Sequence, residues 1–160
     1  MRCILRRREI VADDWAYPGE TAPAGTPLII PLAALRTGPQ AGQLPLGVLL
    51  APADAVEELA PVVAHLALVA VEFPDGGDGR GYSQARLLRT RLGFTGELRA
   101  VGAGVRQDQV FLMARCGFDS LQLAPGVDPR AAQRALTRYT VAYQPGAAGV
   151  SLERQRFFSF

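Results

Sequence analysis

Charged and polar side chains gather in two glycine-bearing loops of this sequence. The first loop, residues 75–83, reads DGGDGRGYS, and the second, residues 102–108, reads GAGVRQD. Loops of this kind that lead into helix N-termini present backbone N–H groups and the positive end of a helix dipole, and arginine adds bidentate donors. The pattern predicts a binding site for a small oxyanion such as sulfite, sulfate or phosphate. The candidate ligand-binding residues are Asp78, Arg80, Tyr82, Ser83, Arg86, Arg106, Gln107 and Asp108.

The same residues support two alternatives to a simple binding site. Asp78 or Asp108 could act as a general acid or base. Arg80 and Arg106 would then hold an anionic substrate, which would make the chain a small-molecule enzyme. Alternatively, aspartate and arginine in one turn form an internal salt bridge, and Ser83 and Asp108 are ordinary helix-capping types. In that case the loops have a structural role only.

Neither loop carries a complete nucleotide-binding motif. GAG at 102–104 follows a predicted strand, but a dinucleotide fingerprint needs glycine at position 107, where Gln107 stands. GGDGRG at 76–81 lacks the GK[ST] ending of a phosphate-binding loop. With His65 as its one histidine, the chain offers no convincing Ser-His-Asp set. We therefore expect no nucleotide binding through either motif, and we assign no catalytic residue.

A regular alternation of apolar strands and amphipathic helices positions these loops. The predicted strands are residues 46–51, 66–73, 97–101 and 119–123, and the predicted helices are residues 54–64, 83–92, 107–116 and 129–141. Such repeats imply parallel pairing, with the loops converging at the carboxyl ends of the strands. We predict an α/β fold with a four-stranded, mainly parallel sheet of consecutive βα units, either an open sheet or a half-barrel, and a short N-terminal β extension.

Composition divides the chain into three parts. Residues 1–43 hold two short apolar runs separated by proline and glycine, and we interpret them as an N-terminal β/loop extension. Residues 44–143 form the α/β domain. Residues 144–160 form a linker and an aromatic C-terminal tail that ends in SLERQRFFSF. A cationic, aromatic tail is costly to leave in water, so we expect it to pack on its own domain, on a second copy or on a partner protein.

Composition also argues against several classes of protein. The chain has 160 residues, 49% of them hydrophobic, which fits one ordinary domain. All 17 basic residues are arginine and the net charge is only +2, so nucleic-acid binding is not indicated. No apolar run approaches the roughly 18 residues that span a bilayer and no signal peptide is recognisable, so we expect no membrane partner and a cytoplasmic location. Cys3 and Cys116 form no CxxC pair, and we predict no metal and no cofactor.

Three segments carry a family resemblance: DGRGYSQARLLRTRLGFTGELRAVG at 78–102, DQ at 108–109 and MARCGFD at 113–119. They resemble a bacterial family of small proteins described as probable oxidoreductases involved in sulfite reduction and typically encoded beside an assimilatory sulfite reductase. The resemblance spans residues 44–142 and implies a role in sulfur assimilation with sulfite reductase as partner. Ala103 and Gly104 stand where the family pattern leads us to expect an acidic and a valine-like residue.

Three functions remain open at this point. The resemblance favours an accessory protein of assimilatory sulfite reduction that acts with sulfite reductase in electron or anion delivery. Because the sequence shows no residue-based electron carrier, any redox activity would need a bound cofactor or the partner's siroheme and iron–sulfur cluster. The second function is a small-molecule enzyme or oxyanion-binding protein with an Arg/Asp site at the strand ends. The third is a non-catalytic oligomeric scaffold, so a homo-oligomer stays an open alternative.

Overall fold

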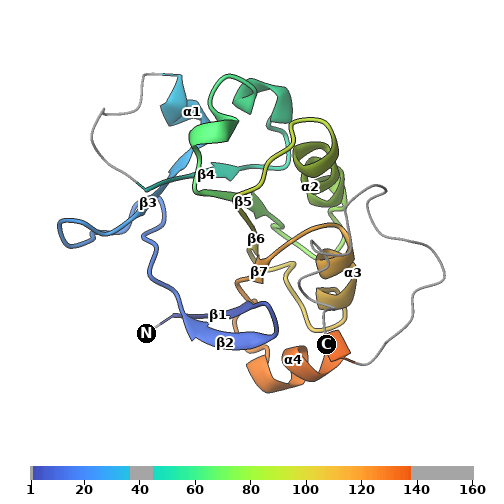
Figure 1. Ribbon diagram of the computed structural model, residues 1–160. Coiled ribbons are helices and arrows are strands. Elements are labelled where there is room, and N and C mark those ends of the chain that lie inside the picture. Colours follow the sequence, from blue (N-terminus) through green and yellow to red (C-terminus); the bar gives the residue numbers. More distant parts are fainter. Residues whose placement is uncertain (1, 37–44, 138–160) are drawn as a thin grey trace.

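The computed structural model describes residues 2–36 and 45–137, and its strands form one mixed sheet (Figure 1). The strands are β1 Cys3–Arg6, β2 Glu9–Ala12, β3 Leu28–Pro31, β4 Leu46–Leu50, β5 Leu68–Glu72, β6 Glu97–Val101 and β7 Ser120–Leu121. Their order across the sheet is β2-β1-β7-β6-β5-β4-β3. Neighbouring strands from β3 to β7 are parallel, whereas β1 is antiparallel to both β7 and β2. The predicted α/β class and mainly parallel pairing are confirmed.

The sheet is open and has seven strands rather than the four that we predicted. The three additional strands come from residues 1–43: β3 pairs with β4 at one edge, and the β1–β2 hairpin extends the sheet beyond β7 at the other. The N-terminal part therefore belongs to the same sheet as the βα units. Each additional strand has only four residues, and such short apolar runs between loop residues give a weak sequence signal.

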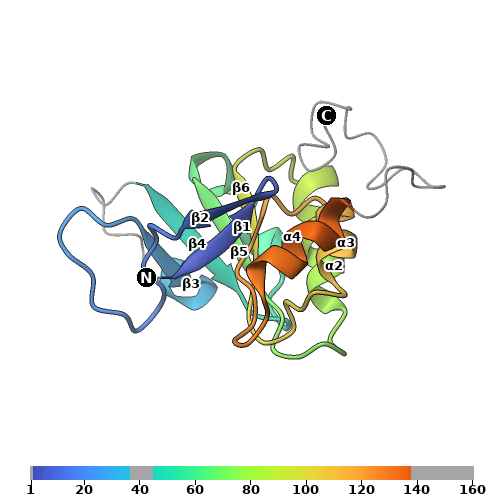
Figure 2. The same ribbon diagram turned by 90° about the horizontal axis from the view of Figure 1, so that it is seen from below.

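Helices cover one face of this sheet. They are α1 Leu32–Leu35, α2 Arg80–Thr90, α3 Val110–Arg115 and α4 Pro129–Thr137, with two short 3-10 helices, η1 Val56–Leu59 and η2 Val63–His65. Because β3 to β7 follow one another in chain order, right-handed crossovers return each connection to the same face. Figure 2 shows α2, α3 and α4 gathered on one side of the strands.

Three predicted helices differ from the observed ones in extent. The helix predicted at 107–116 is α3, which begins only at Val110 after a turn at residues 107–109. Residues 54–64, predicted as one helix, form η1 and η2 instead, and Pro61 between them has no N–H for a continuous helical ladder. Helix α2 begins at Arg80 rather than at residue 83, so Ser83 lies inside the helix and Gly79 precedes it. Gly117, with a φ of 104°, ends the α3 region as predicted.

The main core lies between the helices and the sheet. Alternate strand residues point into it, among them Val48 and Leu50 of β4 and Val69 and Val71 of β5, all fully buried. The opposite face carries a smaller cluster of buried residues. Its members are Ile29, Leu68, Ala70 and Val101. Burial on both faces explains why the central strands are apolar almost throughout.

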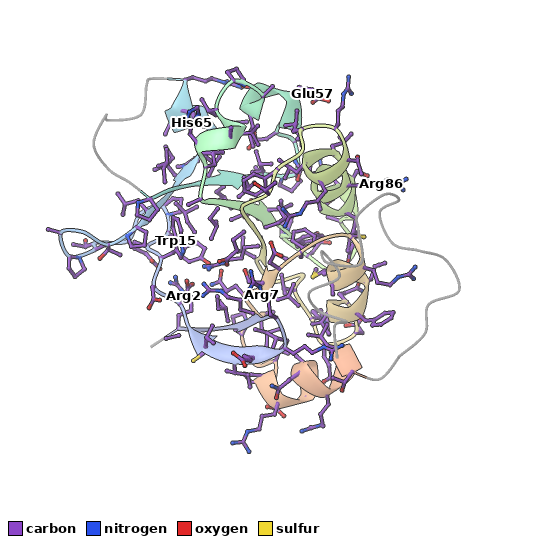
Figure 3. The ribbon with its side chains drawn as sticks, viewed as in Figure 1. Arg2, Arg7, Trp15, Glu57, His65 and Arg86 are labelled. Atoms are coloured by element: carbon purple, nitrogen blue, oxygen red, sulfur yellow. The ribbon has the colours of Figure 1, made fainter. Side chains whose placement is uncertain are left out.

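Residues 13–27 connect β2 to β3, and residues 13–17 run along the face of the sheet opposite the helices. The connection is long because β2 and β3 stand at opposite edges (Figure 1). Trp15, labelled in Figure 3, packs against the start of β4: a Cβ built on Gly47 would lie 3.0 Å from the Trp15 Cζ3 atom. Tyr17 packs against the same apolar cluster. This segment therefore covers part of the face that has no helices.

Residues 37–44 and 138–160 lie outside the described residues, and the expectation for the aromatic tail stays a prediction. Within the described part of the chain, no helix has both the length and the apolar character to cross a membrane.

Candidate functional site

The two glycine-bearing loops meet at the carboxyl ends of β5 and β6. The N–H of Gly104 donates to the carbonyl oxygen of Phe73 at 2.8 Å. A Cβ built on Gly104 would lie only 2.2 Å from the carbonyl oxygen of Asp75, and one on Gly102, whose φ is 109°, only 2.4 Å from that of Phe73. Glycine at these two positions lets the backbones approach closely, so residues 75–83 and 102–108 form one surface, called the loop rim below.

The first loop holds its shape through its own carboxylates. Asp75 Oδ1 accepts hydrogen bonds from the N–H groups of Gly77 at 2.7 Å and Asp78 at 2.9 Å. Asp78 in turn accepts from the backbone N–H of Arg80 at 3.1 Å and from its guanidinium at 2.6 Å. Hydrogen bonds from Arg80 lower the pKa of Asp78 to about 2. Asp78 is therefore ionised at neutral pH and is a poor general acid.

A polar chain of three side chains links α2 to the second loop. The Tyr82 hydroxyl donates to Gln109 Oε1 at 2.7 Å, and Gln109 Nε2 donates to Asp108 Oδ2 at 3.1 Å. Burial raises the pKa of Tyr82 to about 12, so its hydroxyl keeps its proton at neutral pH. Gln109 lies just beyond the predicted set, and its one signal in the sequence is the DQ at 108–109 that belongs to the family resemblance. These bonds fix the second loop against the start of α2.

The remaining candidates lie at the surface. Arg106 is exposed and passes over the first loop, because a Cβ on Gly76 would lie 3.7 Å from Arg106 Cδ. Gln107 and Ser83 are also exposed. Arg86 lies on the outer side of α2 in Figure 3, one turn further along the helix than Tyr82. The structure thus brings Arg106 onto the first loop and places Arg86 further along α2, away from the loops.

A third loop reaches the same edge of the sheet through Gln84. This side chain is 5% exposed, and its Nε2 donates to the carbonyl oxygens of Ala51 at 2.8 Å and Asp54 at 3.0 Å. The carboxylate of Asp54 accepts from the N–H of Ala51 at 2.8 Å, so it closes its own turn rather than capping η1. Gln84 was not among the predicted residues, although a glutamine within an apolar helical stripe is the signal that could have found it.

The other chemically interesting side chains lie apart from this rim. Burial raises the pKa of the Cys116 thiol, and Cys3 is exposed. His65 is also exposed and lies at the opposite end of the molecule from the β1–β2 hairpin (Figure 3). Among the described residues, no three His, Cys, Asp or Glu side chains are arranged to hold a metal ion.

Comparison with known families identifies the larger part of the chain. The model of a family described as bacterial protein of unknown function, DUF934, matches residues 47–152. The chain belongs to this family. No curated protein matches the sequence. The DUF934 match begins inside β4 and includes the whole loop rim, whereas the β1–β2 hairpin and the segment that crosses the sheet precede it.

This DUF934 chain also holds a buried polar cluster that sequence reasoning missed. Arg99, in the middle of β6, is fully buried on the face opposite the helices. Its guanidinium donates to Glu97 at 2.7 Å, Asp13 at 2.6 Å and the Tyr17 hydroxyl at 3.0 Å. Ser120 donates to the same Glu97 oxygen at 2.6 Å. The sequence did contain a signal for this cluster, because Glu97 and Arg99 are charged residues at alternate positions of the strand ELRAV.

Charge pairing determines the ionisation of this cluster. Burial favours the neutral form of Glu97, but the Arg99 guanidinium and the Ser120 hydroxyl outweigh it and lower the pKa of Glu97. Burial raises the pKa of Tyr17 to about 12, against the opposing effect of Arg99. At neutral pH the Glu97 carboxylate and the Arg99 guanidinium are therefore charged, and the Tyr17 phenol beside them keeps its proton. The cluster ties residues 13–17 to the centre of the sheet.

Proposed function

We propose that this protein is an accessory protein of assimilatory sulfite reduction that docks on sulfite reductase through the loop rim. The family description does not name a function, so the proposal rests on the resemblance of residues 78–102, 108–109 and 113–119. These segments supply most of the first loop, α2, β6, both ends of the second loop and the end of α3. Residues 78–83, 102 and 108 of the rim thus carry the resemblance, whereas residues 75–77 and 103–107 lie outside it.

The docking role is supported mainly by the exposed and unpaired side chain of Arg106 within the described residues. Its side chain is exposed, lies over Gly76 and makes no ion pair with any acid of the described residues. An exposed guanidinium held over a neighbouring loop is a good contact for a carboxylate on a partner surface. Arg80 on the same surface is 62% exposed although it is paired with Asp78. Together they favour an acidic surface on the partner.

Docking is better supported than capture of a small anion within the first loop. An anion cradle needs free backbone N–H groups. In this loop, the N–H groups of Gly77 and Asp78 donate to Asp75, and that of Arg80 donates to Asp78. Because carboxylates of the loop already occupy these donors, an incoming anion would have to displace them. Side-chain contacts with a protein partner require no such displacement.

The test is a binding measurement with the sulfite reductase encoded in the same genome. We expect a complex by sedimentation velocity, and we expect Arg106→Ala to weaken it about tenfold because one charged contact is lost. Arg91→Ala is the matched control, since Arg91 is 67% exposed at the far end of α2. Cells with Arg106→Ala should grow more slowly on sulfate and normally on cysteine. Absence of a complex, or equal affinity of both variants, would contradict the proposal.

A further inference from the structure

A second polar site lies at the amino ends of β6 and β7, whereas the loop rim lies at the carboxyl ends of β5 and β6. A cavity of about 90 Å³ opens where β6 and β7 begin. It is lined by Arg6, Arg7, Thr95, Gly96, Glu97 and Asp119. Its size suits a small polyatomic ion and is far below the several hundred cubic ångströms of a typical cofactor or nucleotide pocket.

Both carboxylates in the wall are already neutralised from behind. Glu97 Oε1 accepts hydrogen bonds from the buried guanidinium of Arg99 at 2.7 Å and from Ser120. Asp119 Oδ2 pairs with the guanidinium of Arg89 and accepts the N–H of Leu98 at 3.0 Å. These acids therefore do not need a cation from solution. Of the two lining arginines, Arg6 pairs with Glu97, whereas Arg7 makes no ion pair within the described residues.

Arg6 lines this cavity and has an unused donor. Its NH2 lies 3.3 Å from Glu97 Oε2. Its Nε is buried and has no hydrogen-bond partner within the described residues. A buried N–H without a partner costs about 1–3 kcal/mol, so a ligand that accepts from it would bind favourably.

Arg7 is held beside the cavity by an unfavourable turn. Arg7 and Arg8 connect β1 to β2 with φ values of 46° and 71°, where Asn-Gly is the preferred pair. The N–H of Arg7 donates to the carbonyl oxygen of Asp119 at 3.2 Å, and Gln133 donates to the carbonyl oxygen of Arg8. The turn is thus fixed from both sides, and two arginines occupy positions whose backbone favours glycine or asparagine. Strain of this kind persists where the surrounding structure and a function maintain it.

We propose that this cavity binds a small oxyanion such as sulfate, sulfite or phosphate. The Arg6 Nε and the Arg7 guanidinium are the principal donors, and Thr95 supplies a hydroxyl at the wall. The positively charged Arg89 and Arg99 behind the two carboxylates keep the site electrostatically receptive to an anion. This site is independent of the loop rim and of its docking role.

The test uses the full chain and titrates each anion at constant ionic strength against chloride, with calorimetry and with NMR of arginine Nε–H groups. We expect saturable binding and a shift of the Arg6 Nε–H resonance. Arg7→Gly removes the guanidinium but suits the positive φ, so the variant should be at least as stable as wild type and bind the anion at least tenfold more weakly.

Arg106→Ala serves as the control and separates this site from the loop rim. It should leave anion affinity unchanged, whatever its effect on binding to sulfite reductase. The proposal is overturned if none of the three anions saturates a site at millimolar concentration, or if Arg7→Gly binds as tightly as wild type. It is equally overturned if Arg106→Ala, and not Arg7→Gly, abolishes binding.

Discussion

The guanidinium of Arg99 and the carboxylate of Asp13 lie 2.6 Å apart, with both side chains fully buried, although 86 residues separate them in the sequence. Arg99 belongs to the central strand β6, and Asp13 begins the segment that crosses the sheet. The ion pair therefore joins an N-terminal segment that precedes the DUF934 match to the middle of the matched region. It is a fully buried charged link between these two parts of the chain.

Replacement of Asp13 by alanine should destabilise the fold strongly. Arg99 would keep Glu97 but lose one charged partner in a fully buried setting, and removal of one member of a buried pair costs about 3–5 kcal/mol. Asp14→Ala, at the exposed neighbouring position, should change the free energy of unfolding by less than about 0.5 kcal/mol. Urea denaturation of both variants measures the difference. Similar losses for the two would show that the buried pair is not a principal anchor.

Acid should weaken the same cluster through Glu97. Its pKa is lowered in the folded state, so the stabilisation is fully present above the ordinary glutamate pKa and is lost as the pH falls through the lowered folded value. The free energy of unfolding should therefore decrease below about pH 4.5. Glu97→Gln should be less stable at pH 7 and show a shallower decrease on acidification. An unchanged slope in Glu97→Gln would assign the acid sensitivity to other groups.

The alternation of strands and helices made the parallel half of the fold predictable, and residues 97–101 form β6 with the predicted bounds. The sequence did not show that the N-terminal strands join the main sheet, because their pairing depends on partners far away in sequence, such as Leu5 with Leu121. For the same reason the Arg99 cluster was missed: its partners come from segments that no local pattern connects. The close approach of the two glycine loops was also unpredictable, since Gly102 and Gly104 reveal their contacts with Phe73 and Asp75 only in three dimensions.

Gly104→Ala should damage the loop rim more than a comparable change nearby. The new Cβ would lie 2.2 Å from the backbone oxygen of Asp75, so one of the two loops must move. Overpacking of this kind costs about 1–3 kcal/mol or more. Gly76→Ala is the control, because its Cβ would make an ordinary 3.7 Å contact with the flexible Arg106 side chain.

Thermal unfolding of the two glycine variants gives their stabilities, and sulfite reductase binding gives the effect on the rim. We expect Gly104→Ala to lose affinity at temperatures where it remains folded, since the two loops no longer form one surface. If Gly76→Ala and Gly104→Ala proved equally stable, the close approach of the loops would be wrong.

Arg89 should be the arginine of α2 whose loss costs most stability. Its side chain is only 7% exposed, and its guanidinium donates to the carbonyl oxygens of Phe94, Gly96 and Gly117 and pairs with Asp119. Arg89→Met would leave these acceptors without their donor and should cost about 3–5 kcal/mol.

Two comparisons identify the cause of that loss. Arg91→Met, at the residue that follows α2 and 67% exposed, should cost less than about 0.5 kcal/mol. Arg89→Lys keeps the charge but not the planar fork that reaches several acceptors at once, so its stability should fall between wild type and Arg89→Met. Full stability of Arg89→Lys in urea denaturation would mean that charge alone is sufficient. A loss in Arg89→Lys instead shows that the geometry of the guanidinium holds the end of α2 against the beginnings of β6 and β7.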